Sequence, residues 1–234
     1  MDVHEEQPAD PVGGALQKLN PDLQAASNTP AAFSGLGMRE VVADGRVLYV
    51  SEDGRYVIEG QLYDVDKRVS LSEKAMQKNR VTLLADIPAK DRIIFAPDNP
   101  KYRVVVFTDI ECGFCRKFHR DIEAYNAAGI AVEYVAFPRM GIGSEDFAKM
   151  NSVWCAKDPK AALSQAKLGG EITEGKPNCI SPVAAQYAAG RSGGLTGTPM
   201  ILATDGTQLG GYLTPPELLN ALKMHAAQRQ TAAS

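Results

Sequence analysis

The sequence has no apolar run that approaches the roughly 18 residues of a membrane-spanning helix. Its longest apolar stretches, such as Val104–Phe107, have the length of a strand. It also lacks the basic excess of a nucleic-acid-binding surface, because 25 Lys and Arg residues stand against 28 Asp and Glu residues. With 44% hydrophobic residues the composition is that of an ordinary globular protein, and we expect no nucleic-acid partner.

The N-terminal segment lacks the features of a signal peptide. Met1–Glu6 is acidic and polar, whereas a signal peptide has a basic start followed by an apolar stretch. Two interpretations remain open at this point: the protein is cytosolic, or a signal peptide has been removed.

Cysteine is scarce, with four residues that allow three disulfide connectivities: Cys112, Cys115, Cys155 and Cys179. Two residues separate the first pair, which is a redox or metal-binding spacing. The second pair could close a loop of about 25 residues, a stabilisation of about 3 kcal/mol in an oxidising compartment. The alternative is a zinc site with all four thiols. We disfavour it because the second pair is not a CxxC and the three histidines lack finger spacing, so we expect neither metal nor cofactor.

The first third of the chain predicts a tail and a small sheet. Val12, Leu16 and Leu19 have helical spacing, and the rest of residues 1–30 is typical of a linker. The pairs Asp44-Gly45 and Asp53-Gly54 then predict a meander of strands at 40–43, 46–51 and 56–62. Such a sheet is not stable alone, and either a second copy of the chain or the rest of the same chain must cover it.

The remaining two thirds predict alternating strands and helices. Ser70 and Glu73 fit a capping box that opens a helix of about 13 residues, either a connecting helix or a surface helix. The order that follows is a strand at 102–109, a helix at 112–127, a strand at 130–137, a mostly helical region at 144–189, a hairpin at 199–211 and a last helix at 214–226. We therefore predict an α/β fold.

The motif Cys112-Gly113-Phe114-Cys115 lies at a strand-to-helix junction, which is a reactive place for a thiol. Unpaired N–H groups and the helix dipole favour an anion there, so we expect Cys112 to have a lowered pKa and to be the nucleophile. Cys115 lies one turn further along, shielded and within disulfide reach, and is expected to resolve intermediates. The alternative is an inert pair of core cysteines.

A proline at the start of a strand supports this interpretation. Thr198-Pro199 follows a glycine-rich stretch about 84 residues after Cys115, where thioredoxin-like folds place a cis-proline opposite the CxxC motif. Backbone groups beside it would be free to pair with an extended peptide, so Gly197, Thr198 and Pro199 are candidate substrate-binding residues. The alternative is a trans-proline in a turn.

Several segments together resemble the DsbC/DsbG family of bacterial periplasmic disulfide isomerases. In the C-terminal part they are Phe107–His119, Tyr134–Arg139, Trp154–Asp158 and Gly197–Pro199. Val47–Val50 and Gly60–Val65 resemble the dimerisation domain of that family. The likeness extends over nearly all of the chain after residue 12.

The resemblance implies a thioredoxin-like catalytic domain at 87–234 with a helical insertion, a linker helix at 70–86 and a small α+β dimerisation domain at 1–69. It implies a V-shaped homodimer in the periplasm, its signal peptide removed, that reshuffles non-native disulfides in misfolded secreted proteins. It further implies a structural disulfide between Cys155 and Cys179, and a membrane reductant of the DsbD type that keeps Cys112 and Cys115 reduced. Chaperone activity could accompany the redox chemistry.

Three residues qualify the resemblance. Phe114 stands where the best-known family member has Tyr, a change that should barely alter the mechanism. Val106 stands where thioredoxin has a buried proton-accepting Asp, which weighs against a plain thioredoxin. His119 lies seven residues after Cys112, and we expect an exposed helical histidine rather than an electrostatic role. The competing functions are a general thiol oxidase or reductase of the same fold and a holdase chaperone without essential redox chemistry.

Overall fold

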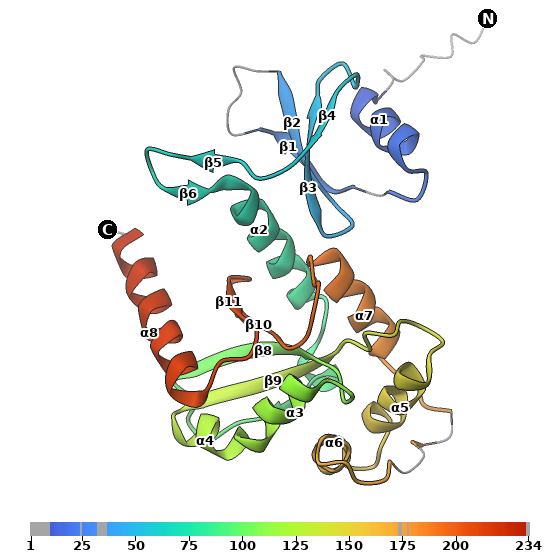
Figure 1. Ribbon diagram of the computed structural model, residues 1–234, viewed down its shortest axis with the longest axis vertical. Coiled ribbons are helices and arrows are strands. Elements are labelled where there is room, and N and C mark those ends of the chain that lie inside the picture. The colour runs from blue at the N-terminus through green and yellow to red at the C-terminus, as the bar shows by residue number, and fades with distance from the viewer. Residues whose placement is uncertain (1–9, 24, 32–36, 173–174, 177, 233–234) are drawn as a thin grey trace, which may run out of the picture. The chain divides into compact units, whose positions relative to one another are not determined.

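The computed structural model describes residues 10–23, 25–31, 37–172, 175–176 and 178–232 (Figure 1). The chain divides into two compact units. One contains Met1–Asn79 with Ser192–Gly194, and the other contains Arg80–Arg191 with Leu195–Ser234. Each unit has its own hydrophobic core, which is the usual mark of separate folding domains.

The N-terminal unit is built on an antiparallel four-stranded sheet. Its strands follow chain order: β1 (Ala25–Pro30), β2 (Met38–Ala43), β3 (Arg46–Ser51) and β4 (Val57–Glu59). Positive φ angles at Asp44 and Gly45 form the tight turn between β2 and β3, as the Asp-Gly pair predicts. A two-stranded hairpin of β5 (Tyr63–Asp64) and β6 (Val69–Ser70) follows.

Strand β1 is a departure from the expected linker. Its sequence is polar and its side chains are mostly exposed, so no apolar alternation reveals it. It forms because its backbone pairs with the edge of β2, from Ala25 opposite Ala43 to Pro30 opposite Arg39. The helix expected before it is α1 (Pro11–Leu19), which lies beside the sheet in Figure 1. Its Val12 and Leu16 belong to the hydrophobic core that the sheet forms.

Helix α2 (Leu71–Ala85) begins at the capping residues expected from the sequence. The hydroxyl of Ser70 accepts a hydrogen bond from the backbone N–H of Glu73 at 3.1 Å, which satisfies one of the unpaired donors of the first turn. No helix in the described part of the chain is long and apolar enough to cross a membrane.

The C-terminal unit contains a five-stranded sheet in the order β11-β10-β8-β9-β7. The central strands β8 (Tyr102–Thr108) and β9 (Ile130–Ala136) are parallel, while β7 (Ile93–Phe95) and the hairpin β10 (Met200–Ala203)–β11 (Gln208–Gly210) extend the sheet antiparallel. The sequence did not predict β7, a three-residue edge strand that lies beside β9. The order of strands and helices from residue 102 onward agrees with the prediction.

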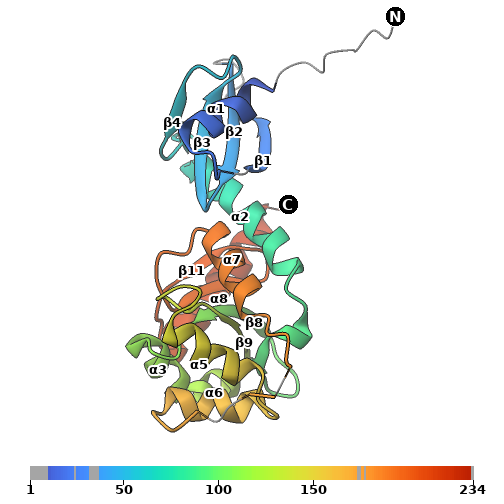
Figure 2. The same ribbon diagram turned by 90° about the vertical axis from the view of Figure 1, so that its right-hand side faces the viewer.

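Helices cover this sheet. They are a 3-10 turn (Ala89–Asp91), α3 (Gly113–Arg120), α4 (Ile122–Ala127), α5 (Glu145–Trp154), α6 (Pro159–Lys167), α7 (Val183–Ser192) and α8 (Pro215–Ala232). The single helix expected at 112–127 is interrupted at Asp121, whose backbone leaves the helical region. Figure 2 shows α3, α5 and α6 on one side of the unit.

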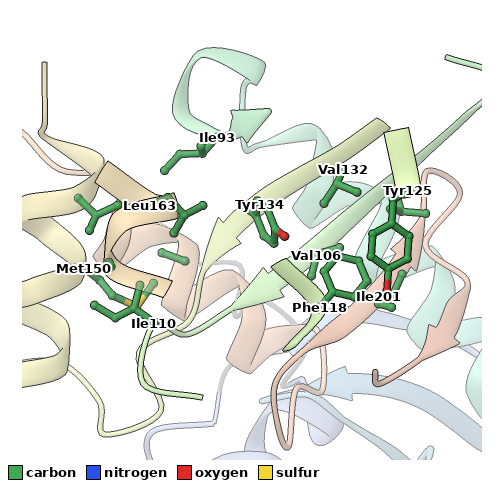
Figure 3. Packing of buried hydrophobic residues seen from close by; sticks show 14 of the residues in the cluster. Ile93, Val106, Ile110, Phe118, Tyr125, Val132, Tyr134, Met150, Leu163 and Ile201 are labelled. Atoms are coloured by element: carbon green, nitrogen blue, oxygen red, sulfur yellow. The ribbon is translucent and has the colours of Figure 1, made fainter. Parts of the chain in front are cut away.

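The core of the C-terminal unit lies between β8, β9 and the helices (Figure 3). Val106 and Tyr134 are fully buried on the central strands, and the ring of Phe118 from α3 stacks on Tyr125 from α4 at 4.3 Å. This packing fixes α3, and with it the CxxC motif, at the end of strand β8.

Candidate active site

Cys112 is the N-cap residue of α3. Strand β8 ends at Thr108, a three-residue connection follows, and the extended backbone of Cys112 leads into the first turn of the helix. Both Cys112 and Cys115 are free thiols and both are buried. In its thiol form the sulfur of Cys112 donates a hydrogen bond to the backbone carbonyl of Thr198 at 3.1 Å.

The surroundings of Cys112 favour its thiolate. The pKa of Cys112 is lowered to about 5, mainly by a hydrogen bond from the Cys115 thiol. The Thr198 side chain, the Cys115 backbone N–H and the charge of Arg139 lower it further, whereas burial raises it. A thiolate rather than a thiol is the attacking species in disulfide exchange. Cys112 is therefore the thiol of the pair that favours the anionic form at neutral pH, which an attacking group in disulfide exchange needs.

The neighbouring thiol has the opposite property. Burial raises the pKa of Cys115 far above its ordinary value, and its hydrogen bond to Cys112 raises it further. The charge of Lys167 and the hydroxyl of Thr108 act in the other direction. Cys115 thus keeps its proton while Cys112 is an anion, which is the division of roles expected of an attacking and a resolving thiol.

The loop opposite the thiols contains the predicted proline. The Thr198-Pro199 peptide bond is cis, and the loop is directly in contact with Cys112 through the Thr198 carbonyl. A cavity of about 460 Å³ opens beside it. Its walls include Gly197 and Pro199 together with the aromatic side chains of Phe114, which is 61% exposed, and Tyr212.

A buried carboxylate organises the connection between β8 and α3. Asp109 is fully buried, accepts a hydrogen bond from the backbone N–H of Glu111 at 2.6 Å and forms an ion pair with Arg139 Nε at 2.7 Å. This pair holds the Arg139 charge near Cys112.

A second carboxyl group, that of Asp146, is affected by Asp109. Burial, followed by the charge of Asp109, raises the pKa of Asp146 to about 6.

His119 corrects the expectation of an exposed histidine. It is buried, with Nδ1 at 3.1 Å from the Tyr134 hydroxyl and Nε2 at 2.9 Å from the Ser164 hydroxyl. Burial, helped by the charge of Lys167, lowers the pKa of His119 to about 4. The ring is therefore neutral at physiological pH and ties α3 to β9 and α6.

Cys155 and Cys179 form a disulfide with a Cα–Cα distance of 5.9 Å. It joins the C-cap of α5 to the segment that precedes α7. The pairing removes two of the four thiols that a zinc site would need. No group of three or more metal-binding side chains gathers among the residues that the structure describes.

Several residues around the thiols were not singled out as site residues from the sequence. Thr108, Asp109, Arg139 and Lys167 come from three separate stretches of chain that meet only in the fold. For Lys167 a signal existed: it lies four residues after the buried Leu163, on the inward face of α6.

Comparison with known proteins identifies both parts of the chain. Residues 3–73 match the family model described as the disulfide bond isomerase protein N-terminal domain, and residues 89–226 match the thioredoxin-like domain. The chain is 36% identical over 221 residues to the thiol:disulfide interchange protein DsbC of Salmonella typhimurium, covering 93% of this chain and 87% of that protein.

A second relative and a solved structure were also compared with the chain. The DsbC of Haemophilus influenzae is 37% identical over 190 residues, 80% of each chain. A solved structure of Proteus mirabilis ScsC in a transitional conformation, 18% identical, covers 65% of this chain and 81% of that one with a TM-score of 0.52, and it supports the fold alone. Cys112, whose thiolate form is favoured, lies at the N-terminus of a helix in a thioredoxin-like domain. The chain belongs to the DsbC family of thiol:disulfide interchange proteins.

Proposed function

We propose that this thiol:disulfide interchange protein is a periplasmic disulfide isomerase, which reshuffles non-native disulfides in misfolded secreted proteins. The observation that carries the proposal is the opposite protonation of two adjacent thiols, with the pKa of Cys112 lowered to about 5 and that of Cys115 raised. An isomerase needs a thiolate that attacks readily and a second thiol that does not compete for the same substrate bond.

The reaction begins when the Cys112 thiolate attacks one sulfur of a substrate disulfide. A Cys112–substrate disulfide forms, the substrate bond breaks, and the second substrate sulfur leaves as a thiolate. That thiolate then attacks another disulfide of the substrate, and a final substrate thiolate releases Cys112 with no net oxidation. When rearrangement stalls, Cys115 attacks Cys112, the substrate leaves reduced, and the enzyme becomes oxidised.

The cavity beside the thiols supports binding of an extended peptide. Gly197, Thr198 and Pro199 line it next to Cys112, and proline leaves no backbone N–H of its own to pair within the sheet. Phe114 and Tyr212 add apolar wall on the other side. We infer that a substrate chain lies along this loop and presents its disulfide to Cys112, with an apolar side chain in the cavity.

The N-terminal unit supports a homodimer. Strand β4 is an edge of its sheet, and large apolar side chains are exposed on and around it: Tyr56, Ile58, Tyr63 and Val65. An apolar sheet edge invites pairing with another strand, and a second copy of the chain across a two-fold axis offers the same edge. We propose residues 1–69 as the dimerisation domain, 70–86 as a linker helix and 87–234 as the catalytic domain.

Two further parts of the proposal follow from the chemistry. A disulfide between Cys155 and Cys179 is stable in an oxidising compartment, which favours the periplasm. In such a compartment Cys112 and Cys115 need an external electron source, for which a membrane reductant of the DsbD type is proposed. A chaperone role would use the same peptide-binding surface.

The experiment is refolding of a scrambled, fully oxidised client by the reduced protein, followed by recovery of client activity. Cys112→Ser should abolish recovery because no thiolate remains to attack. Cys115→Ser should retain part of the recovery, since shuffling through Cys112 needs no resolving thiol, while losing reductase turnover. Equal recovery with Cys112→Ser and wild type would contradict the proposal and favour a holdase. Complete loss with Cys115→Ser would favour a plain reductase.

A further inference from the structure

Lys167 is a buried amine close to the two thiols. Its side chain, at the end of α6, is only 1% exposed, although lysine is among the residues least often buried. Its Nζ donates to the Thr108 hydroxyl at 2.7 Å and to the Asp109 carbonyl at 3.3 Å, and lies 5.6 Å from the centre of the Tyr134 ring. The mechanism described above gives this residue no role.

Thr108 connects the amine to Cys115. It is fully buried at the end of β8, and its hydroxyl also acts on the Cys115 thiol as a hydrogen-bonding partner. A hydroxyl has one donor and two acceptor positions, so it can face a thiol on one side and an amine on the other. Thr108 is therefore the group that the Lys167 amine contacts and whose hydroxyl lowers the pKa of Cys115.

The resolving step requires such a partner. Cys115 must lose its proton before it attacks, yet burial holds it in the thiol form. Val106, the position at which thioredoxin has a proton-accepting Asp, is an apolar core residue here. Burial lowers the pKa of Lys167 to about 8, which brings the amine close to the range in which a proton acceptor works at neutral pH.

The other charged and titratable groups around Lys167 do not replace it. Those that act on it or face it are Cys112, Asp109, Arg116, His119 and Tyr134. The Asp109 carboxylate is engaged by Arg139 and the Glu111 backbone, and burial keeps His119 and Tyr134 neutral. Lys167 is the amine that the Thr108 hydroxyl contacts.

We propose that Lys167 accepts the proton of Cys115 through the Thr108 hydroxyl when Cys115 resolves a Cys112–substrate disulfide. This rests on the proposed role of Cys115 as the resolving thiol. Lys167 acts through Thr108 and is a proton-accepting positioning residue, which never contacts the substrate.

The Cys115 proton passes to Thr108 Oγ1 while the hydroxyl proton of Thr108 passes to the neutral amine of Lys167. The Cys115 thiolate attacks the Cys112 sulfur, the Cys112–substrate bond breaks, and the substrate sulfur leaves with the electron pair. The two enzyme thiols are oxidised to a disulfide and the substrate disulfide is reduced. The Lys167 ammonium, still bonded to the Asp109 carbonyl, later returns its proton to solvent or to Cys115 on reduction.

A stopped-flow reaction of the reduced, full-length protein with the chromogenic disulfide DTNB separates the two steps. Attack by Cys112 releases the first coloured thiolate, and resolution by Cys115 releases the second. In the wild type the second rate should rise with pH in the region near 8. In Lys167→Met the rate of the second phase should fall about a hundredfold at neutral pH. The pH at which this rate rises should move upward by about one unit or more.

Two further variants are compared with Lys167→Met. Thr108→Val keeps the shape and the amine but removes the bridging hydroxyl, and it should slow the second phase in the same direction. Lys160→Met removes an exposed lysine from the same helix and should leave both phases unchanged. Circular dichroism melts check folding, and if Lys167→Met does not fold, Thr108→Val alone decides the outcome.

The two phases distinguish the possible failures. Loss of the first phase in wild-type protein would mean that Cys112 is not the nucleophile, and the proposed function itself would fail. The proton-transfer proposal alone would be overturned by a different result. In that case the first phase is normal, and the second phase of a folded Lys167→Met or Thr108→Val variant has the same pH profile as the wild type. A purely structural lysine would lower the melting temperature without moving that pH profile.

Discussion

At the scale of single residues, the site depends on one thiol pair in two different environments. Cys112 lies at the N-terminus of α3, whereas Cys115, three residues later, faces the buried side of the same helix. The hydrogen bond between them lowers the pKa of one thiol and raises that of the other. The two thiols of one helical turn thus have opposite pKa shifts, which the proposed roles of attacking and resolving thiol require.

Alkylation of the reduced protein tests this difference directly. Because the pKa of Cys112 is lowered to about 5, its thiolate is depleted only as pH falls through 5, and the alkylation rate should be nearly constant above pH 7. Mass spectrometry of the modified peptide should place the label on Cys112. Cys112→Ser should leave Cys115 almost unreactive up to pH 8. Faster labelling of Cys115 than of Cys112 at every pH would reverse the assignment.

At the scale of elements, the disulfide and a hydrogen bond hold the segment between α6 and α7 to the end of α5. Cys155 closes α5, Cys179 lies 24 residues later, and the Lys176 N–H donates to the Cys155 carbonyl at 2.9 Å. Neither cysteine lies on the surface of the cavity beside Cys112. The cross-link therefore concerns the stability of the region from α5 to α7.

Replacing both cysteines of this cross-link, Cys155→Ala with Cys179→Ala, should lower the free energy of unfolding by about 3 kcal/mol. The reason is that the open loop of the unfolded chain regains the entropy that the bond removed. Urea denaturation measures the difference, and the reaction of Cys112 with DTNB should keep its rate. The difference should vanish when wild-type protein is fully reduced. Equal stability of the oxidised wild type and the double variant would contradict this expectation.

At the scale of the whole molecule, the proposed dimer depends on the edge strand β4 rather than on β1. The outer edge of the sheet at β1 has polar, exposed side chains, whereas Ile58 on β4 and Val65 beyond it are 58% and 79% exposed. Large apolar side chains gathered near an unpaired sheet edge are typical of an interface. Two catalytic domains joined there would hold one misfolded client at two points.

The variant Ile58→Glu with Val65→Glu should therefore give a monomer. Negative charges on an apolar interface are desolvated without partners when two copies meet, so the association weakens. Analytical ultracentrifugation measures the mass, and the monomer should keep simple reductase activity while losing most isomerisation of a multi-disulfide client. Leu19→Glu, on the exposed side of α1, is the control and should stay dimeric. A monomeric variant with full isomerase activity would disprove the need for two facing domains.

Local sequence determined much of this protein. Asp-Gly turns, the Ser70–Glu73 cap, the apolar run of β8 and the CxxC motif each act over a few neighbouring residues, so their structures follow from the residues themselves. The comparisons confirm the family and the thioredoxin-like fold that these motifs predict. The place of Cys112 at the N-terminus of α3 was likewise predictable, whereas its lowered pKa depends mainly on the Cys115 thiol acting against burial.

Tertiary structure alone decided the rest. β1 is a strand because the edge of β2 offers hydrogen bonds, although its own sequence carries little strand pattern. β7 has strand-favouring residues, but its three residues are too few to predict an edge strand without β9 beside it. His119 is buried rather than exposed because β9 and α6 supply hydroxyl partners from 15 and 45 residues away. Lys167 reaches Thr108 at the end of β8 only because α6 packs on α3. Burial and charge at these positions depend on residues distant in the chain, which local pattern does not encode.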